Sequence, residues 1–163
     1  MSDRAPYGAR PAVALDGPAI AEIYLRAVRK AMPWLRLAHS DTEVTAWFSD
    51  ELQRRHEAWV ATIDAAVSAF MSLSFDRTWV DHLYVDPDCQ NRGQGSTLLA
   101  LAKSLSAGEL HLWAFERNQA ARSFYERRGF RAVEFGDGST NQEGEPDVRY
   151  RWQRAEPDHV SRG

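Results

Sequence analysis

The spacing of apolar residues in the first third of the chain predicts a short strand and two helices. Residues 10–15 favour the strand, and the Asp-Gly-Pro sequence at 16–18 suits a first helical turn. Apolar residues at i, i+3, i+4 and i+7 mark one buried face of the following helix: Ile20, Ile23, Tyr24 and Ala27. The Met-Pro-Trp sequence at 32–34 ends this helix. Ser40 or Asp41 then caps a second helix, expected to run to about Arg55.

Three β-rich runs follow and predict an antiparallel meander, because short polar turns separate them. The three runs are residues 58–63, 66–75 and 78–85. The remaining elements are a helix at 93–107 ended by Gly108, a strand at 109–114, a helix at 118–128, and strands at 130–135 and 147–153. This order of elements predicts an α/β (α+β) fold with a mixed, largely antiparallel sheet.

The composition predicts one compact domain that spans residues 1–163, with tails at 1–9 and 155–163. A formal net charge of -3 gives no reason to expect a nucleic-acid surface. No stretch approaches the roughly 20 apolar residues that cross a membrane, and the start lacks the apolar region of a signal peptide. A single cysteine, Cys89, excludes an intrachain disulfide. We therefore expect a cytoplasmic protein.

The most informative run is residues 83–97, where a strand stops at a proline and a glycine-bearing turn leads into a helix. Glycines let backbone N–H groups converge, and a helix start adds a partial charge of about +0.5. Such a turn can hold a phosphate largely by main chain, and Arg92 can add a charged contact. The residues expected to bind phosphate are Gln90, Asn91, Arg92, Gly93, Gln94, Gly95, Ser96 and Thr97.

The spacing within this turn decides among three nucleotide-binding motifs. A P-loop requires a lysine where Gly95 stands, and a dinucleotide fingerprint requires a glycine or alanine where Leu98 stands. Residues 90–95 instead resemble the Q/R-x-x-G-x-G/A signature of the GNAT superfamily of N-acetyltransferases. Residues 118–130 resemble that family's N-x-x-A-x-x-F-Y-x-x-x-G-F segment. Two motifs in this order are far more specific than either motif alone.

The resemblance implies a GNAT fold, with a mixed, mostly antiparallel sheet of about seven strands, splayed in the middle and flanked by about four helices. It implies acetyl-CoA as co-substrate, with the pyrophosphate on the glycine turn and the pantetheine arm paired with the strand that carries Leu83, Tyr84 and Val85. A backbone N–H near Val85 would then stabilise the oxyanion of a tetrahedral intermediate. Asn118 would hold the coenzyme arm, although asparagine is also a favoured helix cap.

The acceptor must lose a proton, because a primary amine has a pKa of about 10.4. Alternation along residues 80–85 assigns side chains to two faces. These faces carry Asp81, Leu83 and Val85 on one side and Val80, His82 and Tyr84 on the other. Asp81 shares the face of the family's coenzyme strand and is the first choice as base, with His82 as the alternative. A competing interpretation makes Asp81 the ion-pair partner of a nearby arginine.

Tyr125 corresponds to the family's usual proton donor to the departing thiolate. A phenol, with a pKa of about 10, is a weaker acid than a thiol of about 8.5, so full proton transfer is uphill by roughly 2 kcal/mol. A hydrogen bond that tightens as charge grows on sulfur can be enough. Plain core packing is the competing interpretation for Tyr125, because its helical face also carries apolar residues.

The acceptor side is less constrained by the sequence. The resemblance places the acceptor between the connection of the first two helices, about 31–41, and the loop at 136–146. Trp34, Arg36 and His39 in the connection are candidate acceptor contacts. The acidic residues in and just after the loop are Asp137, Glu143, Glu145 and Asp147. They suit a cationic amine by long-range attraction, although a solvated charged loop is the preferred interpretation.

The expected function is therefore acetyl transfer from acetyl-CoA to a primary amine of a small molecule or peptide. Two alternatives stay open: a non-catalytic acyl-CoA-binding module, and an acyltransferase that uses a longer acyl-CoA. The five histidines show no ligand spacing, so no metal site is expected. We expect neither a nucleic acid nor a membrane as partner, and a homodimer stays open.

Overall fold

The structure is a computed structural model that describes residues 8–156. Its strands are β1 (Ala9–Pro11), β2 (Glu57–Ile63), β3 (Ala66–Leu73), β4 (Val80–Val85), β5 (Glu109–Phe115), β6 (Arg131–Gly136) and β7 (Asp147–Gln153). Its helices are α1 (Gly17–Ala31), α2 (Asp41–Asp50), α3 (Leu52–Arg55), α4 (Gln94–Leu105) and α5 (Gln119–Glu126), with single turns η2 (Ala14–Asp16) and η3 (Pro87–Cys89). No described helix is long and apolar enough to cross a membrane.

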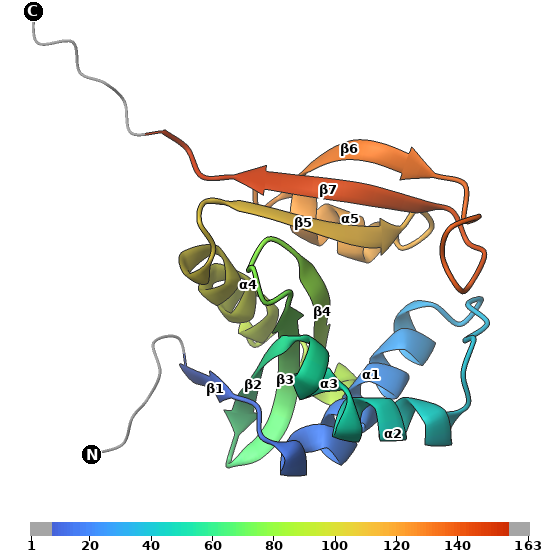
Figure 1. Cartoon of the computed structure of the whole chain (residues 1–163), viewed down its shortest axis with the longest axis vertical. Coiled ribbons are helices and arrows are strands. Elements are labelled where there is room, and N and C mark those ends of the chain that lie inside the picture. Colours follow the sequence, from blue (N-terminus) through green and yellow to red (C-terminus); the bar gives the residue numbers. More distant parts are fainter. Residues whose placement is uncertain (1–7, 157–163) are drawn as a thin grey trace, which may run out of the picture.

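The strands form two antiparallel sheets, in the orders β1-β2-β3-β4 and β5-β7-β6. The sheets meet through a parallel bridge between Trp79 and His111, where the His111 N–H donates to the Thr78 carbonyl at 2.8 Å. Within the described residues no further bridge joins β4 to β5, and the two strands diverge (Figure 1). The splayed GNAT-type sheet predicted from the sequence is confirmed, with its parallel component reduced to this bridge.

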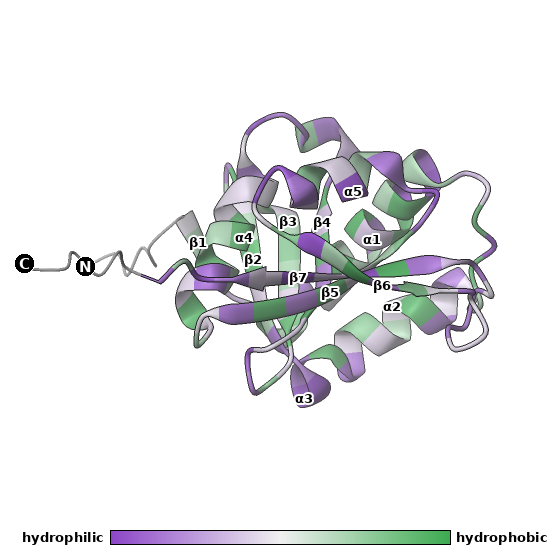
Figure 2. Ribbon diagram, turned by 90° about the horizontal axis from the view of Figure 1, so that it is seen from above, coloured by the Kyte–Doolittle hydropathy of each residue, from purple (hydrophilic) through white to green (hydrophobic). Residues whose placement is uncertain are grey.

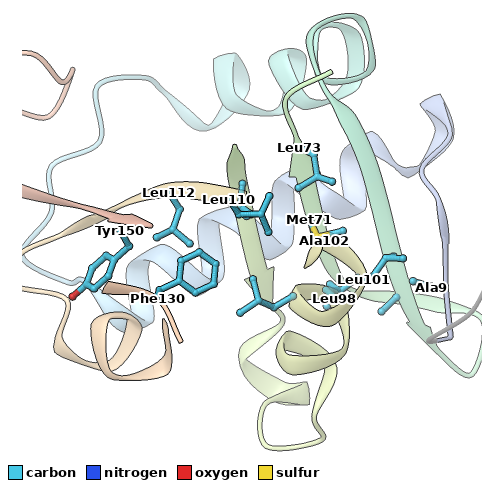
Figure 3. Close-up of a cluster of buried hydrophobic side chains, with 14 of the residues drawn as sticks. Ala9, Met71, Leu73, Leu98, Leu101, Ala102, Leu110, Leu112, Phe130 and Tyr150 are labelled. Carbon is cyan, nitrogen blue, oxygen red and sulfur yellow. The ribbon is translucent and has the colours of Figure 1, made fainter. Parts of the chain in front are cut away.

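The core consists of two apolar clusters on opposite faces of the first sheet. One cluster packs α4 against β3 and continues to the second sheet, where Leu112 and Tyr150 are buried (Figure 3). The other packs α1 and α2 against the opposite face of β2 and β3. β3 is hydrophobic over most of its length, whereas α3 is hydrophilic apart from the buried Leu52 (Figure 2). The first cluster therefore joins the two sheets in one core.

The first strand is shorter than the sequence predicts. Asp16 accepts the Val13 N–H at 2.8 Å and two N–H groups of Arg10 at 2.8 and 2.9 Å, so the chain coils into η2 before α1. The predicted strand at 10–15 is therefore wrong beyond Pro11. Ala9, predicted to lie in a tail, pairs with Ala61. Of the two predicted tails, residues 1–7 and 157–163 lie outside the described residues.

The second helical segment begins as predicted but is divided. The Ser40 hydroxyl accepts the Glu43 N–H at 3.2 Å and so caps α2. The predicted helix to Arg55 is interrupted at Glu51, which separates α2 from α3. The last strand, residues 147–153, is confirmed with the predicted bounds.

A bulge in β4 at Asp81 changes which way Val80 faces. Ser72 pairs with His82, whereas the next residue, Leu73, pairs with Val80, so Asp81 is one residue too many for the ladder. Val80 therefore packs in the same cluster as Leu83 and Val85. The predicted alternation, which placed Val80 beside His82, is wrong here because the extra residue shifts the period by one.

Candidate active site

A cavity of about 920 Å³ lies where β4 and β5 diverge, and residues of α1, α4 and α5 complete its walls. The sequence candidates that line it are Asp81, Leu83, Tyr84, Val85, Gln90, Asn91, Gly93, Gln94, Gly95, Ser96, Asn118 and Tyr125. The candidates that do not line it are His82, Arg92, Thr97, Trp34, Arg36 and His39. The structure thus brings residues of both motifs to one cavity.

The glycine turn brings the start of α4 to the cavity wall. Gly93 has a φ of 77°, in the left-handed region that glycine adopts without strain, and it directly precedes α4. The first N–H groups of a helix have no intrahelical partner, so the start of α4 is suited to an anion. The Thr97 N–H and hydroxyl both donate to the Gly93 carbonyl, at 3.0 and 2.9 Å. Thr97 therefore stabilises the turn by hydrogen bonds and does not line the cavity.

The residues just before the turn are held to α1 by ion pairs. Arg26 donates to Asp86 at 2.9 Å and to Asp88 at 2.7 Å. The Asp86 carboxylate also accepts the Asp88 N–H at 2.9 Å, which shapes η3. The turn is therefore held between α1 and α4 before any ligand binds.

Arg128 is a cavity residue that sequence reasoning missed. Its guanidinium donates to the Ser96 hydroxyl at 2.6 and 3.1 Å and to the Phe124 carbonyl at 2.9 Å, and it stacks on the Phe124 ring at 3.7 Å. Burial and the nearby Arg127 lower the pKa of Arg128, but an arginine stays cationic at neutral pH. The sequence signal that could have found it is its position within the second motif, at residues 118–130.

Asn118 and Tyr125 have structural roles as well as places in the cavity wall. The Asn118 side chain accepts the Ala121 N–H at 3.2 Å, so the helix-cap interpretation is confirmed. The Tyr125 ring packs against Phe130, with ring centroids 5.6 Å apart, and burial raises the pKa of its hydroxyl. Their contacts with a coenzyme stay predictions.

Asp81 is paired with a histidine. The distance from His56 Nδ1 to Asp81 Oδ2 is 2.9 Å, and the two side chains are 19% and 31% exposed. Burial raises the pKa of Asp81, and His56 opposes this shift. The predicted arginine partner for Asp81 is therefore wrong, and the residue that takes its place lies 25 positions earlier in the chain.

His82 lies on the other face of β4, away from the cavity. Its Nδ1 is 2.6 Å from the Ser72 hydroxyl, and its ring lies among those of Trp47 and Phe48, with centroids 5.6 and 5.4 Å away. Burial lowers the pKa of His82 to about 3. The imidazole is therefore neutral at physiological pH and enclosed by aromatic rings.

Both predicted acceptor regions reach the cavity, mostly through residues that were not predicted. Met32 follows α1, Asn141 lies in the loop between β6 and β7, and Asp147 begins β7; all three line the cavity. Asp147 is 7% exposed, and one of its carboxylate oxygens accepts the Asn141 side-chain amide at 3.0 Å. Sequence reasoning placed Asp147 in the acidic group but did not distinguish it from its neighbours.

Trp34 and His39 connect the α1–α2 segment to the second sheet. The Trp34 ring meets Phe115 edge-on at 6.3 Å, and the Arg117 guanidinium lies 4.0 Å from its centroid. His39 Nε2 is 3.2 Å from the Gln142 side-chain oxygen. These contacts link the α1–α2 segment to β5 and to the β6–β7 loop. No group of three potential metal ligands occurs among residues 8–156.

The model of the acetyltransferase (GNAT) family matches residues 20–130, which is more than half of the chain. The chain therefore belongs to this family.

The relatives agree with this assignment. An N-acetyltransferase of Escherichia coli K12, YafP, is 32% identical over 101 residues, which cover 58% of this chain and 63% of that protein. The match thus spans less than two thirds of the relative's length. The apo form of YjaB from Escherichia coli has a TM-score of 0.74 at 24% identity, covering 90% of this chain and 97% of that one. PaiA N-acetyltransferase from Thermoplasma acidophilum, solved with coenzyme A, has a TM-score of 0.68 at 19% identity, covering 89% and 97%.

Proposed function

We propose that the protein transfers the acetyl group of acetyl-CoA to a primary amine by direct attack of the amine. The observation that carries this proposal is that one cavity is lined by the turn before α4, by the diverging strand β4 and by Asp81. An anion site, an unpaired strand edge and a carboxylate are the three features that donor binding and amine activation need.

The donor would lie along α4 and β4. The first N–H groups of α4 and the Arg128 guanidinium would hold the pyrophosphate. The edge of β4 at Leu83, Tyr84 and Val85 would pair with the pantetheine arm, and Asn118 would bind that arm by its amide group. That the solved relative PaiA binds coenzyme A supports this arrangement.

Bound acetyl-CoA would supply an activated thioester, and residues of this chain would accept the proton of the amine and polarise the carbonyl. Asp81 would accept the proton of the amine, and a backbone N–H near Val85 would polarise the carbonyl. Because burial raises the pKa of Tyr125, we propose that its hydroxyl donates a hydrogen bond to the departing sulfur without giving up its proton. We prefer Asp81 to His82 as base because His82 does not line the cavity.

Acetyl-CoA binding is tested by Gly93→Glu. The substitution strains a residue with a φ of 77° and adds negative charge where the phosphates would lie, so affinity should fall by about 100-fold or more, roughly 2.7 kcal/mol. Gly8→Glu is the matched control, because Gly8 also has a positive φ, 65°, and a Cβ added there would meet no atom within 4 Å, but Gly8 does not line the cavity. Isothermal titration calorimetry measures both; equal affinity in the two variants would contradict the assignment.

Turnover is tested by free-thiol release from acetyl-CoA in the presence of a panel of amines. The panel contains aminoglycosides, polyamines, amino acids and peptides with free N-termini. Binding of acetyl-CoA without thiol release for any amine would favour the non-catalytic module. Faster release from a longer acyl-CoA would favour the alternative acyl donor.

A further inference from the structure

Asp81 lines the cavity, whereas its hydrogen-bond partner His56 does not. The bulge at Asp81 turns its carboxylate out of the regular alternation, and His56 Nδ1 meets Oδ2 at 2.9 Å. Among the described residues, Oδ2 alone of the two carboxylate oxygens has a hydrogen-bond partner.

The imidazole of His56 is itself held in place. His56 ends α3 and its N–H donates to the Leu52 carbonyl at 2.8 Å. Its ring centroid lies 5.7 Å from that of Trp47 and 5.8 Å from that of His82. A ring fixed on two sides presents Nδ1 to Asp81 in a constant direction.

We propose that His56 is a positioning residue for acetyl transfer, which holds Asp81 through Oδ2 so that Oδ1 is directed at the acceptor amine. The inference rests on the proposed function. His56 must carry a proton on Nδ1 to donate this bond, which both the Nδ1–H tautomer and the imidazolium provide.

The charges around the pair determine the effect of removing His56. Burial raises the pKa of Asp81, His56 lowers it, and Asp76 in the β3–β4 turn raises it. The carboxylate of Glu57, the next residue after His56, accepts hydrogen bonds from the Arg77 guanidinium at 2.8 and 2.9 Å. His82 is neutral. Without His56, the Asp81 carboxylate should therefore bind a proton at a higher pH and lose its fixed direction.

The test compares His56→Ala and His56→Gln with the wild type. His56→Ala should lower kcat by roughly tenfold, a part of the 10²–10⁴ that a general base contributes, and should move the acid limb of the pH–rate profile to higher pH. His56→Gln keeps a donor and should restore part of kcat. Acetyl-CoA affinity should not change in either variant. His111→Gln is the control, because His111 pairs with Glu109 at 2.8 Å outside the cavity.

A His56→Ala variant with the wild-type kcat and pH profile would overturn the inference. A spectroscopic measurement on the wild-type protein keeps the test independent of turnover and of the folding of the variants: the ¹⁵N shifts of His56 should show a protonated Nδ1. An Nδ1 without a proton at neutral pH would overturn the inference as well. Absence of thiol release from the wild type would instead count against the proposed function.

Discussion

Tyr125 illustrates how one side chain can serve both the core and the site. Its ring packs against Phe124 and Phe130, at centroid distances of 5.2 and 5.6 Å, while the residue lines the cavity. Because burial raises the pKa of the hydroxyl, the proton is harder to remove than in a free phenol. The physical expectation is a hydrogen bond to sulfur, whose strength increases as the thiolate leaves.

Tyr125→Phe tests this expectation. The variant keeps the ring and should retain stability to within about 1 kcal/mol, while kcat falls by about tenfold or more because a donor to the leaving group is lost. Acetyl-CoA affinity, measured by calorimetry, should stay within about twofold. Tyr24→Phe is the control, because Tyr24 is also enclosed but does not line the cavity. Wild-type kcat in Tyr125→Phe would assign this residue to the core alone.

Individual site residues were predicted where a motif fixed them and missed where only the fold brings them together. Gly93 and Tyr125 stand in motifs whose spacing survives in the sequence. His56 meets Asp81 across 25 positions and a bulge, and neither is visible in a periodic pattern. The same bulge made the predicted alternation wrong at Val80, because one extra residue inverts every assignment beyond it.

At the scale of elements, the packing of α1 on α2 depends on a glycine. A Cβ at Gly17 would lie 2.5 Å from the Cα of Ser49 and 2.8 Å from its hydroxyl oxygen. The first distance involves backbone, so a side-chain rotation does not relieve it. The two helices therefore approach closely at this position, and α2 carries the Trp47 ring that contacts His56.

Gly17→Ala should destabilise the protein by about 1–3 kcal/mol, because α2 must move away from α1. Gly95→Ala is the matched control: it is also a helical glycine, but its Cβ would come no closer than 3.4 Å, to the Phe124 ring. The control should be neutral or more stable by up to about 1 kcal/mol, from helix propensity alone. Urea unfolding measures both variants, and equal free energies of unfolding would show that the close contact has no cost.

Most elements were predictable because amphipathic periodicity is a local property. The bounds of β7 were predicted without error, and α4 and α5 were predicted to within a few residues. The strand at 10–15 failed because the carboxylate of Asp16 bonds back to Val13 and Arg10, a contact that competes with extension. The division of the sheet was inferred from family resemblance, since strand order depends on long-range pairing.

At the scale of the whole molecule, the two sheets share an apolar core but diverge at β4 and β5. An edge strand presents N–H and C=O groups that lack partners in its sheet, and the cavity-facing edge of β4 is such an edge. A ligand arm that pairs with this edge would join the sheets, whereas a ligand confined to the glycine turn would contact α4 alone. The two cases differ in which amides they protect.

Hydrogen exchange with two ligands distinguishes these cases. Acetyl-CoA should slow amide exchange both at the start of α4 and in β4 at Leu83, Tyr84 and Val85, because the pantetheine arm would bond to the strand. Adenosine 3′,5′-bisphosphate, which has no pantetheine arm, should slow exchange at the start of α4 and leave β4 unchanged. At about 100 times its Kd, either ligand should stabilise the fold by about 2.7 kcal/mol, so comparison at equal saturation removes the global contribution. Equal protection of β4 by both ligands, or none by acetyl-CoA, would mean that the arm does not pair with β4.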